Sequence, residues 1–263
     1  MLLGRRAFIE GLGATAASGA GASRPWPNGA HGAVSLTYDD GLTSHLDVAA
    51  PALEARGWRG NFFLTLENMA DRVGDWKKVA ASGHELCNHT IHHRCDLRPF
   101  NPDRYIHNEI VEAQTVFDAQ FGKQPRIFAY PCGATNLGLG NANQELHRYT
   151  TLLSHAGFMA ARTSDGDPMS PAYAWRKRMA LNATAPTYEK DSPVEALDYL
   201  ELALRRGAWA ILVFHTLTPG KLDPGDTSID THEAILDAIA QRPFWVAPMG
   251  EVLEHVRPRA LRI

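Results

Sequence analysis

The chain has 263 residues, of which 44% are hydrophobic and 21% are charged. This composition is typical of a globular protein and excludes a collagenous, coiled-coil or largely disordered chain. The formal net charge of −3 provides no basic excess for binding a nucleic-acid backbone. No apolar run reaches the roughly 18 residues of a membrane-spanning helix, so we expect no stable membrane insertion.

Residues 1–22 have the features of an export signal. Arg5 and Arg6 precede Phe8, and a stretch rich in Gly and Ala ends in an A-x-A-like cleavage site at residues 20–22. This pattern predicts a twin-arginine-type signal, a periplasmic or extracellular location and a single mature domain at 23–263. The alternative is an uncleaved, disordered tail.

Strand and helix signals alternate along the rest of the chain. In chain order, the predicted elements are a strand at 33–38, a helix at 46–56, a strand at 61–65, a helix at 75–81, a strand at 84–88, a helix at 103–121, a strand at 126–130, a loop at 136–141, a helix at 144–156, a strand at 158–162, a loop at 168–178, a short strand at 179–181, a helix at 193–205, a strand at 209–214, a helix at 228–241, a strand at 244–246 and a helix at 249–256. The alternation predicts an α/β fold with a parallel sheet, and about seven repeats favour a barrel over an open sheet.

Several polar or turn-forming residues directly follow predicted strands. They are the pair Asp39 and Asp40, then His89, Pro131 and His215. In α/β barrels the carboxyl ends of the strands carry the active site. We therefore expect these segments to meet at one mouth.

Two of the histidines have the spacing of metal ligands. His89 and His93 are four residues apart, as on one face of a helical turn, and Asp40 provides a carboxylate as third ligand. One Asp and two His leave coordination positions open for water and substrate. Asp39 then remains available as a general base. The alternatives are solvated or hydrogen-bonded histidines and a simple Asp-Asp-Gly turn ending at Gly41.

Three motifs resemble those of the polysaccharide deacetylase (NodB-homology) carbohydrate esterases. TYDDG at 37–41 resembles the first motif, HTIHH at 89–93 the second and LVFH at 212–215 the last. The resemblance covers about residues 30–256. It implies a single distorted (β/α)7 barrel and a metal-dependent hydrolase that removes acetyl groups from an acetylated oligo- or polysaccharide.

The resemblance also implies a role for each motif residue. Asp39 would be the general base, His215 the general acid, and Asp40, His89 and His93 the metal ligands. Zinc is the expected metal, with cobalt, nickel, manganese and iron as alternatives. FAYPCG at 128–133 resembles the third motif and implies that the backbone N–H of Cys132 stabilises the oxyanion.

The third motif departs from the family pattern. Ala129 stands where many members have an Arg that pairs with the catalytic Asp, and we expect Arg176 or Arg178 to supply that charge. Cys132 stands where many members have an aromatic residue. The residues predicted to contact substrate are Tyr130, Pro131 and Trp175.

Other functions and states remain open. We expect N-acetyl rather than O-acetyl substrates, because an amine leaves only when protonated and His215 provides the acid. The alternatives are an amide hydrolase of the allantoinase or imide-hydrolase type, and a non-catalytic carbohydrate- or metal-binding protein. Cys87, Cys95 and Cys132 could form a disulfide, stay free or bind a soft metal. The sequence predicts neither the polymer nor the oligomeric state.

Overall fold

The computed structural model describes residues 25–185, 191–220 and 222–258. The expected export signal at 1–22 lies outside these ranges. Within them, no helix is both long and apolar enough to cross a lipid bilayer.

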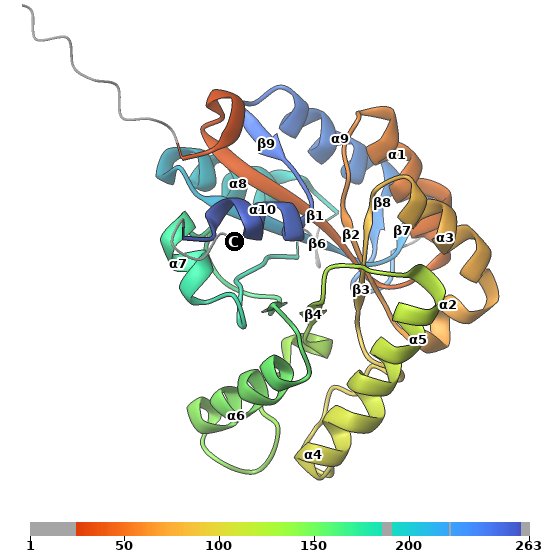
Figure 1. Ribbon diagram of the computed structural model, residues 1–263. Helices are drawn as coiled ribbons and strands as arrows, with labels where there is room; N and C mark the ends of the chain where they lie inside the picture. The colour runs from red at the N-terminus through yellow and green to blue at the C-terminus, as the bar shows by residue number, and fades with distance from the viewer. Residues whose placement is uncertain (1–24, 186–190, 221, 259–263) are drawn as a thin grey trace, which may run out of the picture.

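A parallel sheet of seven strands forms the centre of the fold (Figure 1). Its strands are β1 (Gly32–Asp40), β2 (Asn61–Leu64), β3 (Glu85–Asn88), β4 (Ile127–Ala129), β5 (Ala160–Arg162), β6 (Trp209–Phe214) and β9 (Phe244–Val246). The strand order is β5-β4-β3-β2-β1-β6, and β9 pairs with the beginning of β1. All seven predicted strands of this sheet are confirmed.

The sheet is curled, and an irregular segment bridges its two ends. Residues 181–184 lie between β5 and β6, where Leu181 pairs with Arg162 and Thr184 pairs with Leu212. The predicted strand at 179–181 is therefore present only as this bridge. The result is a distorted barrel of the predicted (β/α)7 type.

Helices cover the outside of the sheet (Figure 1). They are α1 (Ala50–Ala55), α2 (Leu66–Met69), α3 (Val73–Ala81), α4 (Pro102–Tyr105), α5 (Glu112–Phe121), α6 (Ala142–His155), α7 (Pro171–Arg176), α8 (Val194–Arg206), α9 (Ile229–Ala240) and α10 (Met249–Val256). Short 3-10 or π-helical turns lie at η1 (Pro27–Gly29), η2 (His45–Ala49), η3 (Ala70–Arg72), η4 (Ile106–Val111) and η5 (Pro131–Gly133). A separate two-stranded ribbon pairs β7 (Leu217–Thr218) with β8 (Thr227–Ser228).

Other predicted segments were wrong in part. The predicted loop at 168–178 contains α7, which begins at Pro171 with Ser170 before it. Proline is well suited to the first position of a helix, but it also made this stretch look like a loop. The predicted helix at 103–121 is interrupted by the wider π-helical turn η4 between α4 and α5.

Alternate residues of β1 face two different apolar clusters. Val34, Leu36 and Tyr38 pack in the layer between the sheet and the outer helices, whereas Ala33 packs inside the barrel. Because side chains alternate along a strand, Asp39 shares the inward side with Ala33. The pattern of β1 thus carries the carboxylate of Asp39 into the barrel.

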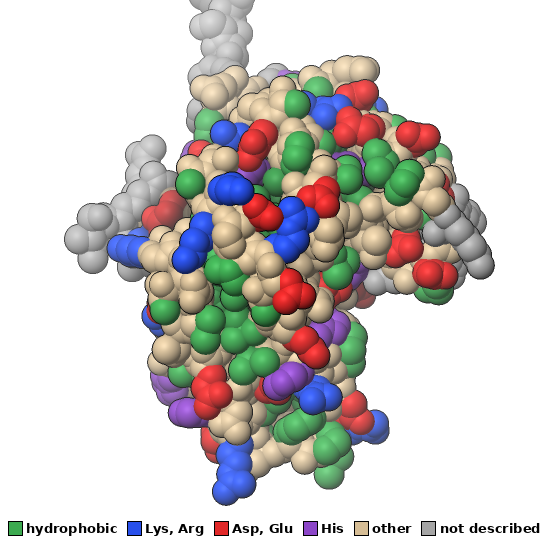
Figure 2. Space-filling view, turned by 90° about the vertical axis from the view of Figure 1, so that its right-hand side faces the viewer, with side chains coloured by type: hydrophobic (Ala, Val, Ile, Leu, Met, Phe, Trp, Pro, Cys, Tyr) green, Lys and Arg blue, Asp and Glu red, His purple; other side chains and the backbone are tan. Residues whose placement is uncertain are grey.

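The face that carries α1 and α3 has a mixed surface. Acidic and basic side chains are interspersed there with hydrophobic ones, with no large field of one sign (Figure 2). This face has no basic patch of the kind that binds a nucleic-acid backbone.

A buried carboxyl group lies at the end of the barrel where the strands begin. Oε2 of Glu85 accepts hydrogen bonds from the Gly250 N–H at 2.9 Å and from Nδ2 of Asn61 at 2.6 Å. Oδ1 of Asn61 accepts from the Met249 N–H at 2.7 Å, so the two side chains together cap the first turn of α10. Burial raises the pKa of Glu85 from 4.5 to about 7, although these hydrogen bonds oppose the rise.

This raised pKa predicts a pH-dependent stability. Between pH 4.5 and 7 the folded chain holds a proton on Glu85 that the unfolded chain releases, so the free energy of unfolding falls as the pH rises. Glu85→Gln keeps an oxygen acceptor but cannot ionise. Relative to the wild type, this variant should gain about 3 kcal/mol between those pH values, as measured by denaturant unfolding. Glu67→Gln, at an exposed residue, is the matched control. If the free energy of unfolding changed with pH in the same way for the wild type and Glu85→Gln, the prediction would be contradicted.

Candidate functional site

A cavity of about 540 Å³ opens at the carboxyl ends of the strands. It brings together residues from β1, β5, the segment after β6, the loop after β3 and the turn after β4. The lining residues are Asp39, Asp40, His93, Tyr130, Cys132, Gly133, Arg162, Ser164, Thr184, Ala185 and His215. The expectation that the strand ends converge on one mouth is confirmed.

Asp39 and Asp40 reach this cavity although adjacent strand residues normally point to opposite faces. β1 ends at Asp40, whose backbone takes the left-handed conformation with φ of 79° and turns its carboxylate back toward the mouth. The Asp40 carbonyl accepts from the Thr65 hydroxyl at 3.1 Å and from Nδ2 of Asn68 at 2.9 Å. Thr65 and Asn68, which follow β2, therefore hold the Asp40 backbone through its carbonyl and do not occupy its carboxylate.

His89 presents an unprotonated ring nitrogen to the two carboxylates. Its Nδ1 lies 2.9 Å from the carbonyl of Ala129, which can only accept, so Nδ1 carries the hydrogen. Burial lowers the pKa of His89 to about 4, which keeps the ring neutral at pH 7. Its Nε2 therefore faces Oδ1 of Asp40, 3.6 Å away, with a free lone pair.

His93 reaches the same carboxylate from a loop. Residues 89–93 form no helical turn, so the expected helical placement of the two histidines is wrong. Thr90 adopts φ of 73°, Asn88 accepts from its N–H at 2.8 Å, and its hydroxyl accepts from the His93 N–H at 3.0 Å. This folded loop brings Nε2 of His93 to 3.5 Å from Oδ1 of Asp40.

These three side chains have the geometry of a cation site. Their ligand atoms lie within 4.8 Å of one another, and the Asp40 to histidine distances of 3.5 and 3.6 Å are too long for strong hydrogen bonds. Oδ1 of Asp40 and Nε2 of His89 are buried without a hydrogen-bond partner among the described residues. In a tetrahedral site with bonds of about 2.0–2.2 Å, ligand atoms lie about 3.4 Å apart. The residues therefore fit a divalent metal, which would satisfy both buried atoms.

Arg162 pairs with Asp39 and was missed by the sequence analysis. Its Nη2 donates to Oδ1 of Asp39, and both side chains are buried, at 1% and 6% exposure. It crosses the barrel from the end of β5 and stacks over the ring of Phe63 at 4.5 Å. Arg162 supplies the charge that is absent at Ala129. A signal was present, because Arg162 is the last residue of a predicted strand, one position before the place where the other site residues occur.

The pairing sets the protonation state of Asp39. Burial raises the pKa of this carboxyl, but the guanidinium of Arg162, with smaller contributions from neighbouring histidines, outweighs burial and lowers the pKa to about 2. Asp39 is therefore a carboxylate at neutral pH. Oδ2 of Asp39 lies 3.8 Å from Nε2 of His89, beside the proposed cation position.

His215 lines the cavity from the end of β6, and a second histidine holds its backbone. His45 accepts from the Leu42 N–H through Nδ1 at 3.3 Å and lies 2.9 Å from the His215 carbonyl through Nε2. Nε2 of His45 is thus the donor to that carbonyl. Burial lowers the pKa of His45 to about 4, so its ring is neutral. The sequence analysis assigned His45 no function.

The turn after β4 brings Cys132 to the mouth. Cys132 adopts φ of 55° inside the 3-10 turn η5, which follows Pro131. Tyr130 lines the cavity, but its ring is buried in the outer core and its hydroxyl donates to the Met179 carbonyl at 2.7 Å. Pro131 is buried as well. Neither side chain presents an open face for a sugar ring.

The structure does not bring Trp175, Arg176 or Arg178 to the cavity. Arg178 stacks on Trp175 at 4.9 Å and donates to its carbonyl, while Arg176 lines a different hollow beside α6. None of the three lines the cavity within the described residues. We expected Arg176 or Arg178 to pair with Asp39, but Arg162 does so instead.

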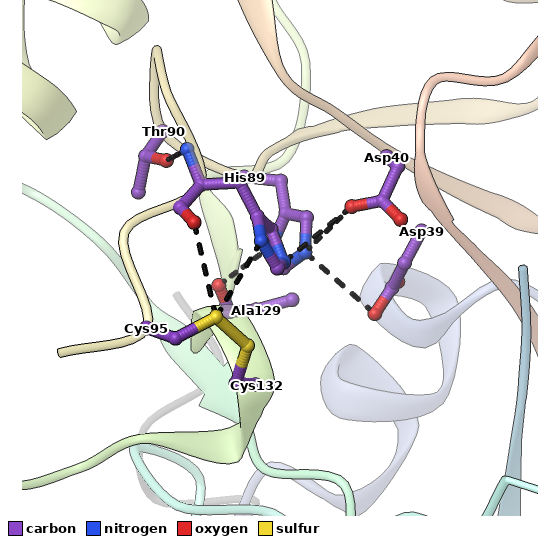
Figure 3. The surroundings of a disulfide bond; sticks show 8 residues. Asp39, Asp40, His89, Thr90, Cys95, Ala129 and Cys132 are labelled. Atoms are coloured by element: carbon purple, nitrogen blue, oxygen red, sulfur yellow. Dashed lines mark hydrogen bonds and ion pairs between the residues drawn. A yellow bond between two sulfur atoms is a disulfide. The ribbon is translucent and has the colours of Figure 1, made fainter. Parts of the chain in front are cut away.

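Cys95 and Cys132 form a disulfide beside the two histidines, and Cys87 is a free, buried thiol. In Figure 3 the imidazole of His89 lies between the carboxylates of Asp39 and Asp40 and the Ala129 carbonyl, with the disulfide below. The disulfide joins the loop after β3 to the turn after β4.

Unusual backbone conformations concentrate at this mouth. Among the described residues, six non-glycine residues have positive φ, and four of them are Asp40, Thr90, His93 and Cys132. Such conformations cost about 1–3 kcal/mol each and persist where surrounding contacts enforce them. Their concentration at this mouth supports its choice as the candidate functional site.

Comparisons with known proteins show what this chain is similar to. The polysaccharide deacetylase family model matches residues 27–150. A gellan lyase from a Bacillus species is 22% identical over 241 residues, which is 89% of this chain and 10% of that protein. A peptidoglycan-N-acetylglucosamine deacetylase from Bacillus cereus is 30% identical over 101 residues, 38% of this chain and 36% of that protein. The chain thus spans a minor part of the length of these relatives.

A solved structure has the same fold. The Xyl-CE4 domain of a multidomain xylanase, from the hindgut metagenome of Trinervitermes trinervoides, superposes with a TM-score of 0.58 at 15% identity. The match covers 85% of this chain and 90% of that domain. At this identity the likeness concerns the fold.

Proposed function

Because this chain belongs to the polysaccharide deacetylase (NodB-homology) family, we propose that it removes acetyl groups from an acetylated oligo- or polysaccharide by metal-dependent hydrolysis. The proposal rests on two groups of residues that lie next to each other at one cavity. Asp40, His89 and His93 form a cation site, and the ionised Asp39 lies beside them.

The first function is metal binding. Asp40, His89 and His93 would hold the cation, and the hydrogen bond from His89 to Ala129 orients one ligand ring. Zinc suits this set of oxygen and nitrogen donors, and cobalt, nickel, manganese and iron are the alternatives. When bound, the cation supplies a Lewis acid for the acetyl carbonyl and lowers the pKa of a coordinated water.

The second function is proton transfer. The carboxylate of Asp39, held by Arg162, accepts a proton from the attacking water. The backbone N–H of Cys132 donates to the oxyanion of the tetrahedral intermediate, a contact of a kind worth about 10²–10³ in rate. His215, whose backbone His45 holds, donates a proton to the leaving group.

The proposed acid favours an amide substrate. An alkoxide leaves from an ester with limited help, whereas an amine leaves an amide only after it has been protonated. His215 lines the same cavity as the two carboxylates and follows β6, the strand that pairs with β1, which supports this role. We therefore assign N-acetyl rather than O-acetyl groups as the preferred substrates.

The proposal includes export. Residues 1–22 act as a twin-arginine-type signal, and the catalytic domain occupies 23–263. Support comes from the Cys95–Cys132 disulfide, because disulfides persist mainly in oxidising compartments outside the cytosol.

Acetate release tests the function. Purified protein is incubated with chitin oligomers, peptidoglycan, poly-N-acetylglucosamine and acetylxylan, and both acetate and bound metal are measured. We expect release from an N-acetylated substrate, loss of release with a chelator, and recovery when zinc or cobalt is added back. His89→Ala should lose both bound metal and acetate release, because it removes one of three ligands.

The exposed His155 provides the matched control. His155→Ala should retain both metal and activity. Acetate release that persists without metal would contradict the proposal and favour a metal-free amide hydrolase. Metal binding with no release from any of the four substrates would favour a binding protein.

A further inference from the structure

The ring of His93 lies between two sets of metal-binding atoms. Its Nε2 faces Oδ1 of Asp40 at 3.5 Å, and its Nδ1 lies 3.9 Å from Sγ of Cys95. Cys95 is bonded to Cys132, so both sulfur atoms border the same edge of the ring. The imidazole of His93 thus lies between Asp40 and His89 on one side and the two cysteines on the other.

The sulfur side has the donor atoms of a cation site, and its nitrogen–sulfur distance suits one. Nδ1 of His93 and the two Sγ atoms lie within 4.8 Å of one another. With zinc–sulfur bonds of about 2.3 Å and zinc–nitrogen bonds of about 2.0–2.1 Å, a tetrahedral site separates sulfur and nitrogen by about 3.6 Å. The observed 3.9 Å is close to this separation. Both cysteines are exposed, so a reductant and an ion can reach them.

We propose that reduction of the Cys95–Cys132 disulfide creates a second metal site, formed by the two thiolates and Nδ1 of His93. The disulfide takes up two electrons and two protons from a dithiol reductant, which becomes a disulfide itself. Binding of Zn²⁺, Cd²⁺ or Co²⁺ then releases the two thiol protons. Thiolate and imidazole donors suit these borderline and soft cations.

The two sites exclude each other through His93. A neutral imidazole has one free lone pair, so a ring that binds through Nδ1 carries its proton on Nε2. The cation at the sulfur site would thus withdraw His93 from Asp40 and His89. In the oxidised protein the disulfide has no thiolate to offer, and His93 stays available to the first site. The disulfide therefore directs the metal as well as joining two loops.

Cobalt provides a direct test, because thiolate ligands give Co²⁺ an intense near-ultraviolet charge-transfer band. The full-length protein is reduced with dithiothreitol, freed of reductant without oxygen, and titrated with Co²⁺. We expect the band in the reduced protein, saturating with bound cobalt, and no such band in the oxidised protein. The Cys95→Ser/Cys132→Ser protein should lack it, whereas Cys87→Ala should retain it, because Cys87 is buried and is not one of the three clustered residues.

Two results would overturn the inference. One is a reduced protein with titratable Cys95 and Cys132 thiols but no charge-transfer band. The other is a band of undiminished intensity in His93→Ala, because His93 would then not be a ligand. Acetate release is measured in parallel. Its absence in both redox states would refute the proposed deacetylase function and leave the thiolate site standing, since that site rests only on the placement of three side chains.

Discussion

Asp39→Asn is expected to lower kcat for acetate release by about 10²–10⁴-fold, the usual range for loss of a general base. The carboxamide occupies the same volume and can still contact Arg162, but it has no basic oxygen to accept a proton. The three proposed metal ligands are untouched, so the variant should bind as much metal as the wild type. The two measurements are the steady-state rate on the best substrate and the metal content after dialysis.

The separation of rate from metal content makes this variant informative. Asp71→Asn, at an exposed carboxylate that does not line the cavity, is the control and should change neither quantity. A fully active Asp39→Asn would show that another group takes the proton. A variant that loses its metal would instead place Asp39 among the ligands, in agreement with the 3.8 Å between its Oδ2 and His89.

Arg162→Met should reduce both activity and stability. Removing the guanidinium leaves the Asp39 carboxylate buried without its partner, and breaking a buried ion pair in this way costs about 3–5 kcal/mol. Methionine fills a similar apolar volume above Phe63, so the loss comes mainly from charge. Denaturant unfolding of the metal-free protein measures it, because a bound cation would partly neutralise Asp39.

A double-mutant cycle distinguishes this ion pair from ordinary packing. Asp39→Asn/Arg162→Met removes both charges and should be less destabilised than Arg162→Met alone. Arg148→Met breaks an exposed ion pair with Asp103 and should change stability by no more than about 0.5 kcal/mol. Strictly additive effects of the two buried substitutions would contradict a direct interaction between Asp39 and Arg162.

The sequence predicted the regular parts of the fold because these depend on local patterns. Apolar runs identified the seven strands of the barrel sheet, and the strand-end rule pointed to Asp39, Asp40, His89 and His215 before any geometry was known. Barrel closure by residues 181–184 was predicted only in part, as a short strand at 179–181, since that segment makes only isolated bridges.

The site details that were missed depend on long-range packing. Arg162 contacts Asp39 across 123 positions of the sequence, and only the curl of the sheet brings them together. The cysteine pairing had several possible outcomes, because spacing does not determine which thiols meet. The loop that aims His93 depends on left-handed residues such as Thr90, which propensities disfavour.

The contact between Arg162 and Asp39 joins a short strand of the sheet to its long central strand. Arg162 is the last residue of β5, a strand of three residues whose outer neighbour is only the isolated bridge at Leu181, whereas Asp39 lies on β1 with full strands on both sides. Short terminal strands open more readily than central ones. A brief excursion of β5 would release the base from its guanidinium while Asp40, His89 and His93 keep their places. In the proposed mechanism, such an excursion would leave Asp39 more basic and less firmly held, without disturbing the three residues assigned to the cation.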